Sequence, residues 1–211
     1  MLLENKKLEE LILRFPEDVQ EIFSQMIISY QLGYVDYVYQ TDDVSIQNRR
    51  IKNLVKSFRR MDYFYVMPLS QDLALDVINQ WAYPKEFSSF EINHKHPNYS
   101  QFISEEARGD SYLAIIRNGA HIGYAYFVAQ PDGDIDLTFA LKPNRMGKGL
   151  GVAFYQSIED YLKTNHQAKR LLLELSLDNS RALRLMEKLG YERLGETESG
   201  LRLAKMMEED K

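Results

Sequence analysis

A glycine-rich stretch between a predicted strand and a predicted helix constrains this chain most. Residues 135–141 alternate apolar with polar side chains, as a half-buried strand does. Apolar side chains then recur at helical spacing over residues 150–162, and Gly147, Gly149 and Gly151 stand around this junction. Glycines at alternate positions let a backbone pass close to a ligand, and the unpaired N–H groups at a helix start attract anions. The stretch therefore predicts a phosphate or pyrophosphate site.

Two common phosphate-binding motifs do not match this stretch. The dinucleotide-binding fingerprint needs glycines at positions one, three and six, and the sixth position counted from Gly147 is Val152. The phosphate loop that ends in Gly-Lys-Ser/Thr is absent from the sequence. A tight turn without any ligand is an alternative that this segment alone does not exclude.

A second junction between a strand and a helix follows. Residues 170–177 read as a strand, and Asp178-Asn179-Ser180 offers a cap for a helix that Gly190 ends. In order and spacing, the two junctions resemble the signature of the GCN5-related N-acetyltransferases, the GNAT family. The motifs that carry the resemblance are Gly147-Lys148-Gly149-Leu150-Gly151, Asn179-Ser180-Arg181-Ala182 and Glu187-Lys188-Leu189-Gly190-Tyr191. Weaker matches upstream extend it over about residues 61–207.

The resemblance implies an α/β (α+β) fold with a mixed, mostly antiparallel sheet flanked by helices. The residues predict strands at 63–66, 112–116, 122–129, 135–141, 170–177 and 202–206, with a hairpin turn at Asn118-Gly119. They predict a helix over residues 71–80. The family also implies that the strands before the glycine loop and before Asn179 splay apart to admit acetyl-CoA.

Acetyl-CoA is the co-substrate that the resemblance implies. The strand backbone would pair with the pantetheine amides, the loop amides would hold the pyrophosphate, and an N–H near Ala140 would receive the thioester oxygen. Asn179 would bond the pantetheine, or would serve only as a helix cap. Met146 stands where the family often has Arg or Gln, and Arg145 and Lys148 are nearby cations. The predicted co-substrate-binding residues are Phe139, Ala140, Leu141, Met146, Gly147, Lys148, Gly149, Leu150, Gly151 and Asn179.

Catalysis needs a base for the acceptor amine and, in many family members, a tyrosine that protonates the thiolate. Asp136 is the candidate base. The alternative is that Asp136 is only an outward-facing polar residue of its strand. Met186 occupies the position of the tyrosine and cannot donate a proton. Tyr191, the nearest phenol, is a weak candidate acid, and a core role is its alternative. A thiol has a reference pKa of about 8.5, so a thiolate can also leave unprotonated.

The aromatic segment over residues 81–102 is where we expect the acceptor to bind. The predicted acceptor-binding residues are Trp81, Tyr83, Glu86, Phe87 and Glu91. The aromatic side chains would form walls, or would pack in the core, while the two carboxylates would bind a cationic substrate. His94 and His96 form a His-x-His pair without an evident third ligand, so we expect no metal.

Composition narrows the class of protein. The 211 residues include no cysteine, which excludes disulfides, a Cys-based metal site and a Cys nucleophile. The net charge of −5 argues against nucleic acid and for a cationic partner. No secretory pattern and no apolar run of about 18 residues is evident, so we expect a cytoplasmic protein without membrane association. The expected partner is a small-molecule or protein amine acceptor, and the chain would be a monomer or homodimer.

The chain is predicted to divide into a helical region at 1–60 and a GNAT domain at 61–211. The front region predicts a helix over residues 17–30, an interruption at Gly33 and a basic amphipathic helix over residues 45–60. Through Tyr34–Val38 and Gln47–Ile51 it faintly resembles the helical unit that ends the bacteriocin-protection (OmpD-associated) proteins. We expect its basic residues to form a solvated face of a packed helix, and a nucleic-acid-binding face is the alternative. These residues are Arg49, Arg50, Lys52, Lys56, Arg59 and Arg60.

Two functions of different class follow from the resemblance. The first is an acetyl-CoA-dependent N-acetyltransferase that moves an acetyl group to a primary amine by direct attack. The alternative is a catalytically weak, CoA-binding regulatory or partner-binding protein whose N-terminal helices carry the function. The glycine loop favours both, and Met186 favours the second.

Overall fold

A computed structural model of the chain describes residues 2–207 and shows two compact units. The first comprises the residues up to Phe64 together with Ile116–His121, and the second comprises Tyr65–Ile115 and the residues from Ile122 onward. The division into a 1–60 region and a 61–211 domain stays a prediction.

The first unit is helical and has a hydrophobic core of its own. Aromatic rings fill its centre, where Phe23 lies 5.1 Å from Phe15 and 6.0 Å from Phe58 between ring centroids. Val19 and Val38 are fully buried beside them. The helices are α1 (Leu2–Arg14), α2 (Glu17–Ser24), α3 (Ile28–Tyr39) and α4 (Val44–Phe58).

The predicted helix over residues 17–30 is wrong, because the chain breaks between α2 and α3. The side-chain amide of Gln31 donates to the carbonyls of Phe23 and Met26 and so helps to satisfy the backbone groups at the end of α2. The N–H of Ile27 donates to Gly119 at 2.7 Å, away from any helix. Gly33, the predicted interruption, lies inside α3 instead. The break between α2 and α3 therefore depends in part on Gly119, which is far away in the sequence.

The basic helix forms as predicted, as α4. The carboxylate of Asp43 accepts from the N–H groups of Ser45 and Ile46 and so caps its start. Two cations, one in α4 and one directly after it, contact the unit itself, since Arg50 lies over the ring of Tyr37 and Arg59 pairs with Asp18. These two side chains are therefore engaged within the protein.

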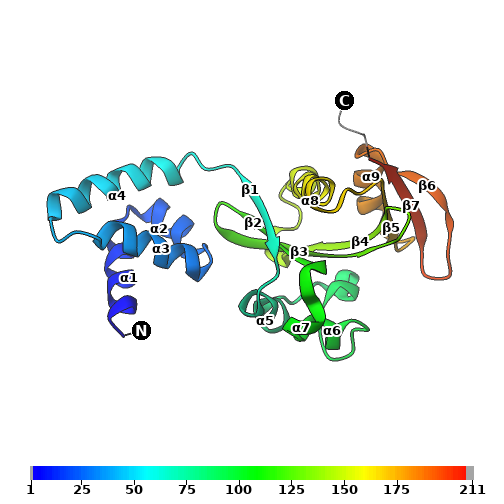
Figure 1. Ribbon diagram of the computed structural model, residues 1–211, viewed down its shortest axis with the longest axis horizontal. Coiled ribbons are helices and arrows are strands. Elements are labelled where there is room, and N and C mark those ends of the chain that lie inside the picture. Colours follow the sequence, from blue (N-terminus) through cyan, green and yellow to red (C-terminus); the bar gives the residue numbers. More distant parts are fainter. Residues whose placement is uncertain (1, 208–211) are drawn as a thin grey trace. The chain divides into compact units, whose positions relative to one another are not determined.

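The second unit is built on a sheet whose strand order is β1-β2-β3-β4-β5-β7-β6 (Figure 1). β4 is antiparallel to β3 and parallel to β5, while β7 is antiparallel to both β5 and β6. This mixed, mostly antiparallel sheet confirms the predicted fold class. The strands are β1 (Phe64–Pro68), β2 (Tyr112–Arg117), β3 (Ala120–Ala129), β4 (Asp134–Leu141), β5 (Arg170–Leu175), β6 (Glu192–Glu196) and β7 (Leu201–Met206).

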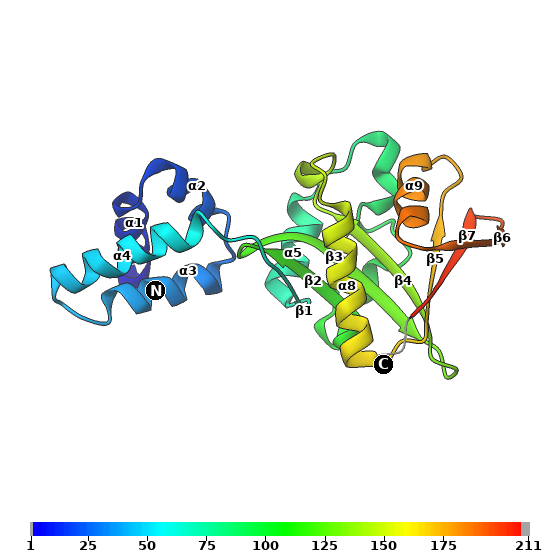
Figure 2. The same cartoon turned by 90° about the horizontal axis from the view of Figure 1, so that it is seen from above.

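Helices cover both faces of this sheet (Figures 1 and 2). α8 crosses one face, where Phe139 packs against Phe154 and Tyr155 at 6.0 and 5.8 Å between ring centroids. The opposite face is covered by α5–α7, and there Phe102 packs against Tyr124. The helical segments are α5 (Gln71–Gln80), η1 (Lys85–Phe90), α6 (Tyr99–Ile103), α7 (Glu105–Arg108), η2 (Gly109–Ser111), η3 (Pro143–Arg145), α8 (Gly151–His166) and α9 (Ser180–Lys188).

The sequence pattern predicted the turn between β2 and β3 but not the strand β6. Asn118 and Gly119 both adopt positive φ, at 51° and 81°, as a two-residue hairpin turn requires, so this turn is confirmed. β6, by contrast, was not predicted. All five of its residues are exposed, so the strand lacks the alternation that marks a half-buried one.

Candidate active site

β4 and β5 separate where the glycine loop and α9 begin. Their parallel register starts with Asp134 opposite Arg170 and ends with Asp136 opposite Leu172. Beyond that point the described register gives residues 137–141 no partner on β5, although they remain paired with β3. The predicted splay is confirmed, and it leaves one edge of β4 available to a ligand.

The hydrogen-bond pattern shows which backbone groups face this gap. The N–H of Lys142 donates to Ile122 on β3 at 2.7 Å. Because an antiparallel ladder alternates, the N–H of Ala140 also points to β3, whereas those of Phe139 and Leu141 point into the gap. Near Ala140, where the sequence predicts a donor for the thioester oxygen, the N–H groups that face the gap are thus those of Phe139 and Leu141.

The glycine loop has the conformation that its sequence requires. Gly147 and Gly149 adopt φ of 79° and 75°, in the region that non-glycine residues rarely enter. A Cβ added to Gly149 would meet no atom within 4 Å, so the backbone there borders open space. The loop leads into α8, a helix of 16 residues that begins at Gly151. Successive N–H groups before a long helix suit an anion.

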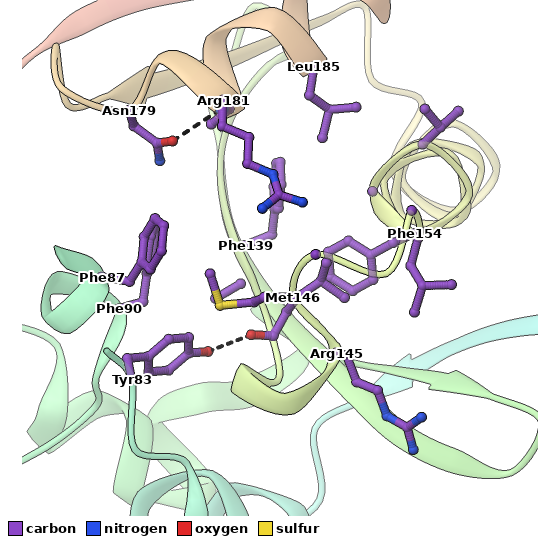
Figure 3. A pocket seen from close by; sticks show the side chains of 18 of the residues that line it. Tyr83, Phe87, Phe90, Phe139, Arg145, Met146, Phe154, Asn179, Arg181 and Leu185 are labelled. Atoms are coloured by element: carbon purple, nitrogen blue, oxygen red, sulfur yellow. Dashed lines mark hydrogen bonds between the residues drawn. The ribbon is translucent and has the colours of Figure 1, made fainter. Parts of the chain in front are cut away.

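A cavity of about 360 Å³ lies between this loop, β4 and α9 (Figure 3). Aromatic side chains from the segment after α5 form one wall, α9 forms another, and the loop forms the third. Its lining is Tyr83, Phe87, Phe90, Phe139, Ala140, Leu141, Arg145, Met146, Gly147, Gly149, Leu150, Gly151, Val152, Phe154, Asn179, Arg181, Ala182, Leu185 and Lys188. All the predicted co-substrate residues except Lys148 line this loop cavity.

Tyr83 closes the loop cavity on the strand side. Its hydroxyl donates to the carbonyl oxygen of Leu141 at 2.8 Å (Figure 3). Burial raises the pKa of Tyr83, so the phenol stays protonated and acts as a donor. This hydrogen bond occupies the carbonyl of Leu141 and leaves its N–H to a ligand.

The position of Asn179 is compatible with both of its predicted roles. Its side-chain oxygen accepts from the N–H of Ala182 at 3.0 Å and caps α9. The side chain also lines the loop cavity, and Figure 3 shows its amide nitrogen on the cavity side of this cap. Capping by the oxygen and donation to a ligand by the nitrogen are therefore compatible.

A second cavity, of about 620 Å³, adjoins the first and is acidic. Three carboxylates line it, from Glu86, Glu174 and Asp178, and Arg181 is the basic residue of the lining. The two cavities share four wall residues, namely Phe87, Phe90, Asn179 and Arg181. The remaining lining of this acidic cavity is Ser89, His96, Tyr126, Thr138, Leu175, Ser176, Ser180 and Ser199.

Two of the predicted acceptor residues lie outside these cavities. Trp81 is buried, lies 6.0 Å from Tyr124 between ring centroids, and donates its indole N–H to Asp76 at 2.9 Å. It packs in the core, which was its alternative. Glu91 follows η1 and lines neither cavity, whereas Tyr83, Glu86 and Phe87 do line them.

The structure does not bring the predicted catalytic pair to either cavity. Asp136 forms an ion pair with Arg202 and accepts from Gln130 at 3.2 Å. Tyr191 is buried, and its hydroxyl bonds that of Tyr155 at 2.9 Å. The phenol of Tyr191 is held in the core, which was its alternative, and its role as an acid stays a prediction. Met186 is also buried and lines neither cavity.

His96 lines the acidic cavity as a neutral side chain. Burial lowers its pKa, and its Nδ1 accepts from the N–H of Asn98 at 3.2 Å. The proton of the neutral ring is therefore assigned to Nε2. Among the described residues, no group of three or more His, Cys, Asp or Glu side chains is placed to hold a metal ion.

Sequence reasoning missed several residues of the two cavities. Phe90, Tyr126 and Glu174 carry no motif, and only the fold brings them together. Arg181 belongs to the motif that begins at Asn179, and this position in the sequence is the signal that could have identified it. The helices formed by residues 2–207 include none with the length and apolar character that a membrane span needs.

Comparisons with known proteins agree with this geometry. Residues 75–191 match the model of the acetyltransferase (GNAT) family. No curated protein sequence matches the chain significantly.

Solved structures share the fold at low sequence identity. The aminoglycoside acetyltransferase AAC(6')-Ib in complex with coenzyme A gives a TM-score of 0.55 at 18% identity, over 68% of this chain and 95% of that chain. The N-acetyltransferase PseH of Campylobacter jejuni gives 0.52 at 18% identity, over 69% and 99%. A GNAT-family acetyltransferase from Bacillus anthracis gives 0.56 at 12% identity, over 70% and 96%. These chains share the fold of about two thirds of this chain.

Proposed function

The chain belongs to the GNAT family of acetyltransferases, and from this premise we propose that it transfers an acetyl group from acetyl-CoA to a primary amine of a small, cationic acceptor. The observation that carries the proposal is the pair of adjoining cavities. One is built on a glycine loop suited to pyrophosphate, and the other is lined by three carboxylates. Their four shared wall residues are where the two substrates would meet.

The loop cavity would hold acetyl-CoA. The free edge of β4 would pair with the pantetheine amides as an added strand, and the loop amides between Met146 and Gly151 would bind the pyrophosphate. Related structures support this assignment, because AAC(6')-Ib is known with coenzyme A and with acetyl-CoA. The N–H of Leu141 faces the gap and would donate to the thioester oxygen as it gains negative charge.

The acidic cavity would hold the acceptor. A cluster of carboxylates attracts ammonium groups and raises their local concentration. AAC(6')-Ib in complex with ribostamycin is an example of this fold with an amine-bearing ligand. We propose an acceptor with more than one cationic group, since Glu86, Glu174 and Asp178 line a single cavity.

The attacking amine must lose a proton, and Glu174 is the carboxylate that we propose to accept it. It lies on β5 and lines the acidic cavity, and Ser199 donates a hydrogen bond to it. Asp136, the base predicted from the sequence, is already paired with Arg202. The amine nitrogen would form a bond to the acetyl carbon, and the carbon–sulfur bond would then break to release the thiolate of CoA.

A thiol-release assay tests the function. The protein is incubated with acetyl-CoA and a panel that pairs neutral monoamines with di- and polyamines, amino sugars and peptide N-termini. We expect turnover to be fastest with multiply charged small amines. Calorimetry with CoA distinguishes this enzyme from the alternative function. Binding of CoA without turnover of any amine would favour a regulatory CoA-binding protein. Buried Met186, in place of the family tyrosine, is the observation that favours that second candidate.

A further inference from the structure

We propose that Arg181 binds the pyrophosphate of the co-substrate from the wall opposite the glycine loop, an inference that rests on the proposed function. Arg181 is the second residue of α9 and is exposed. It lines both the loop cavity and the acidic cavity. Figure 3 shows its side chain extended from α9 into the loop cavity, on the side of Met146.

The distance between Arg181 and the loop fits a bridging anion. A Cβ built on Gly147 would lie 3.9 Å from each terminal nitrogen of the guanidinium. The group therefore faces the backbone of the loop without touching it. An anion held by the loop N–H groups would come within reach of two parallel donors, which is the geometry in which arginine binds phosphate.

The loop itself contributes little positive charge at this place. Met146 lines the cavity with an uncharged side chain. Figure 3 shows the guanidinium of Arg145 directed away from Arg181. Lys148 is exposed and does not line the loop cavity. Arg181 thus adds, from α9, a cation on the side of the cavity that faces Gly147.

Three arginines of the strands in the second unit pair with carboxylates, whereas the structure gives Arg181 no carboxylate partner among residues 2–207. Arg170 pairs with Asp134, Arg193 with Glu187 and Arg202 with Asp136. Within the described part of the chain, no hydrogen bond or ion pair joins the guanidinium of Arg181 to another residue. In the part of the chain that the structure describes, Arg181 therefore faces the glycine loop without a carboxylate partner and is available to a ligand.

Calorimetry with CoA and with dephospho-CoA tests the assignment, because both compounds contain the pyrophosphate and only CoA has the 3′-phosphate. Arg181→Gln should weaken the binding of both compounds equally, by about 10- to 100-fold, as expected for a lost hydrogen bond to a charged group. Arg184→Gln is the matched control, because Arg184 is exposed on the same helix and lines neither cavity. Its affinities should equal those of the wild type.

Three outcomes would overturn the proposal, and they differ from one another. Wild-type affinity of Arg181→Gln for both compounds would exclude any phosphate contact. A loss confined to CoA would move the contact to the 3′-phosphate. Failure of the wild type to bind CoA would contradict the proposed function as well. Should the Gln variant unfold, Arg181→Lys provides the comparison, since it keeps the charge, loses the planar fork and should bind both compounds with intermediate affinity.

Discussion

The side-chain oxygen of Asn179 accepts a hydrogen bond of 3.0 Å from the backbone N–H of Ala182. This contact starts α9 and fixes the side chain, so that the amide nitrogen lies toward the loop cavity (Figure 3). A helix cap and a ligand contact are usually weighed as rival roles for an asparagine at the start of a helix. Here one side chain offers both, through different atoms.

Two substitutions of Asn179 should separate these roles. Asn179→Ser keeps a good capping oxygen but removes the amide, so Tm should hold while the affinity for CoA falls by about 3- to 10-fold. Asn179→Ala should lose the cap as well and cost about 1 kcal/mol of unfolding free energy. Thermal unfolding and calorimetry measure the two effects. Equal CoA affinity of the Ser variant and the wild type would reduce Asn179 to a cap.

Tyr191→Phe should change stability rather than catalysis. The substitution removes the 2.9 Å hydrogen bond to Tyr155 and leaves that buried hydroxyl with one partner fewer. We expect a loss of about 1 kcal/mol in the free energy of unfolding and a nearly unchanged kcat at every pH. Chemical denaturation and initial rates of thiol release provide the measurement. If turnover instead fell by about two orders of magnitude, the size of a general-acid contribution, the role of Tyr191 as the acid would be supported.

Local patterns predicted the parts of this protein whose conformation depends on local chemistry. Gly147 and Gly149 were identified because glycines at alternate positions let a backbone approach a ligand, and both adopt a positive φ that suits glycine. Asn179 was identified because short polar side chains cap helices. The α/β class followed from periodicity and from the order of two motifs. These features need no knowledge of distant contacts.

The features that were missed depend on partners far away in the sequence. Tyr191 was considered as an acid because nothing local shows that its hydroxyl meets Tyr155, 36 residues earlier. The direction of the Ala140 N–H depends on its register with β3. The break before α3 depends on the bond between Ile27 and Gly119. Glu174 lines the acidic cavity because of the position of β5 in the sheet, which no local pattern shows.

Deletion of residues 1–60 should lower stability while sparing CoA binding. The helical unit packs on the hairpin tip, where Ile27 donates to Gly119 and where a Cβ on Gly119 would lie 2.8 Å from Met26. Removal of these contacts exposes the tip, so we expect a lower Tm or poorer solubility. Calorimetry with CoA should give an affinity within about threefold of the full chain, since no residue of 1–60 lines the loop cavity.

The same deletion distinguishes a structural role from nucleic-acid binding. Arg50 and Arg59 are engaged within the helical unit, so fewer of the cations over residues 49–60 are available to nucleic acid than the sequence suggested. We therefore expect no salt-sensitive binding of duplex DNA by the full chain. A steep fall of DNA affinity with salt, lost on deletion, would contradict this view.

The identity of the base is the sharpest test of the site. Glu174→Gln keeps the size of the side chain and can still accept from Ser199, but it cannot take a proton at neutral pH. We expect kcat/KM for the acceptor to fall by roughly 10²–10⁴-fold, with little change in CoA affinity. Asp136→Asn is the matched comparison, because it alters a carboxylate of the adjoining strand that is paired with Arg202. Initial rates over a pH series measure both variants. A larger loss in Asp136→Asn than in Glu174→Gln would return the role to Asp136, acting through a water, and would confine Glu174 to binding the cationic acceptor.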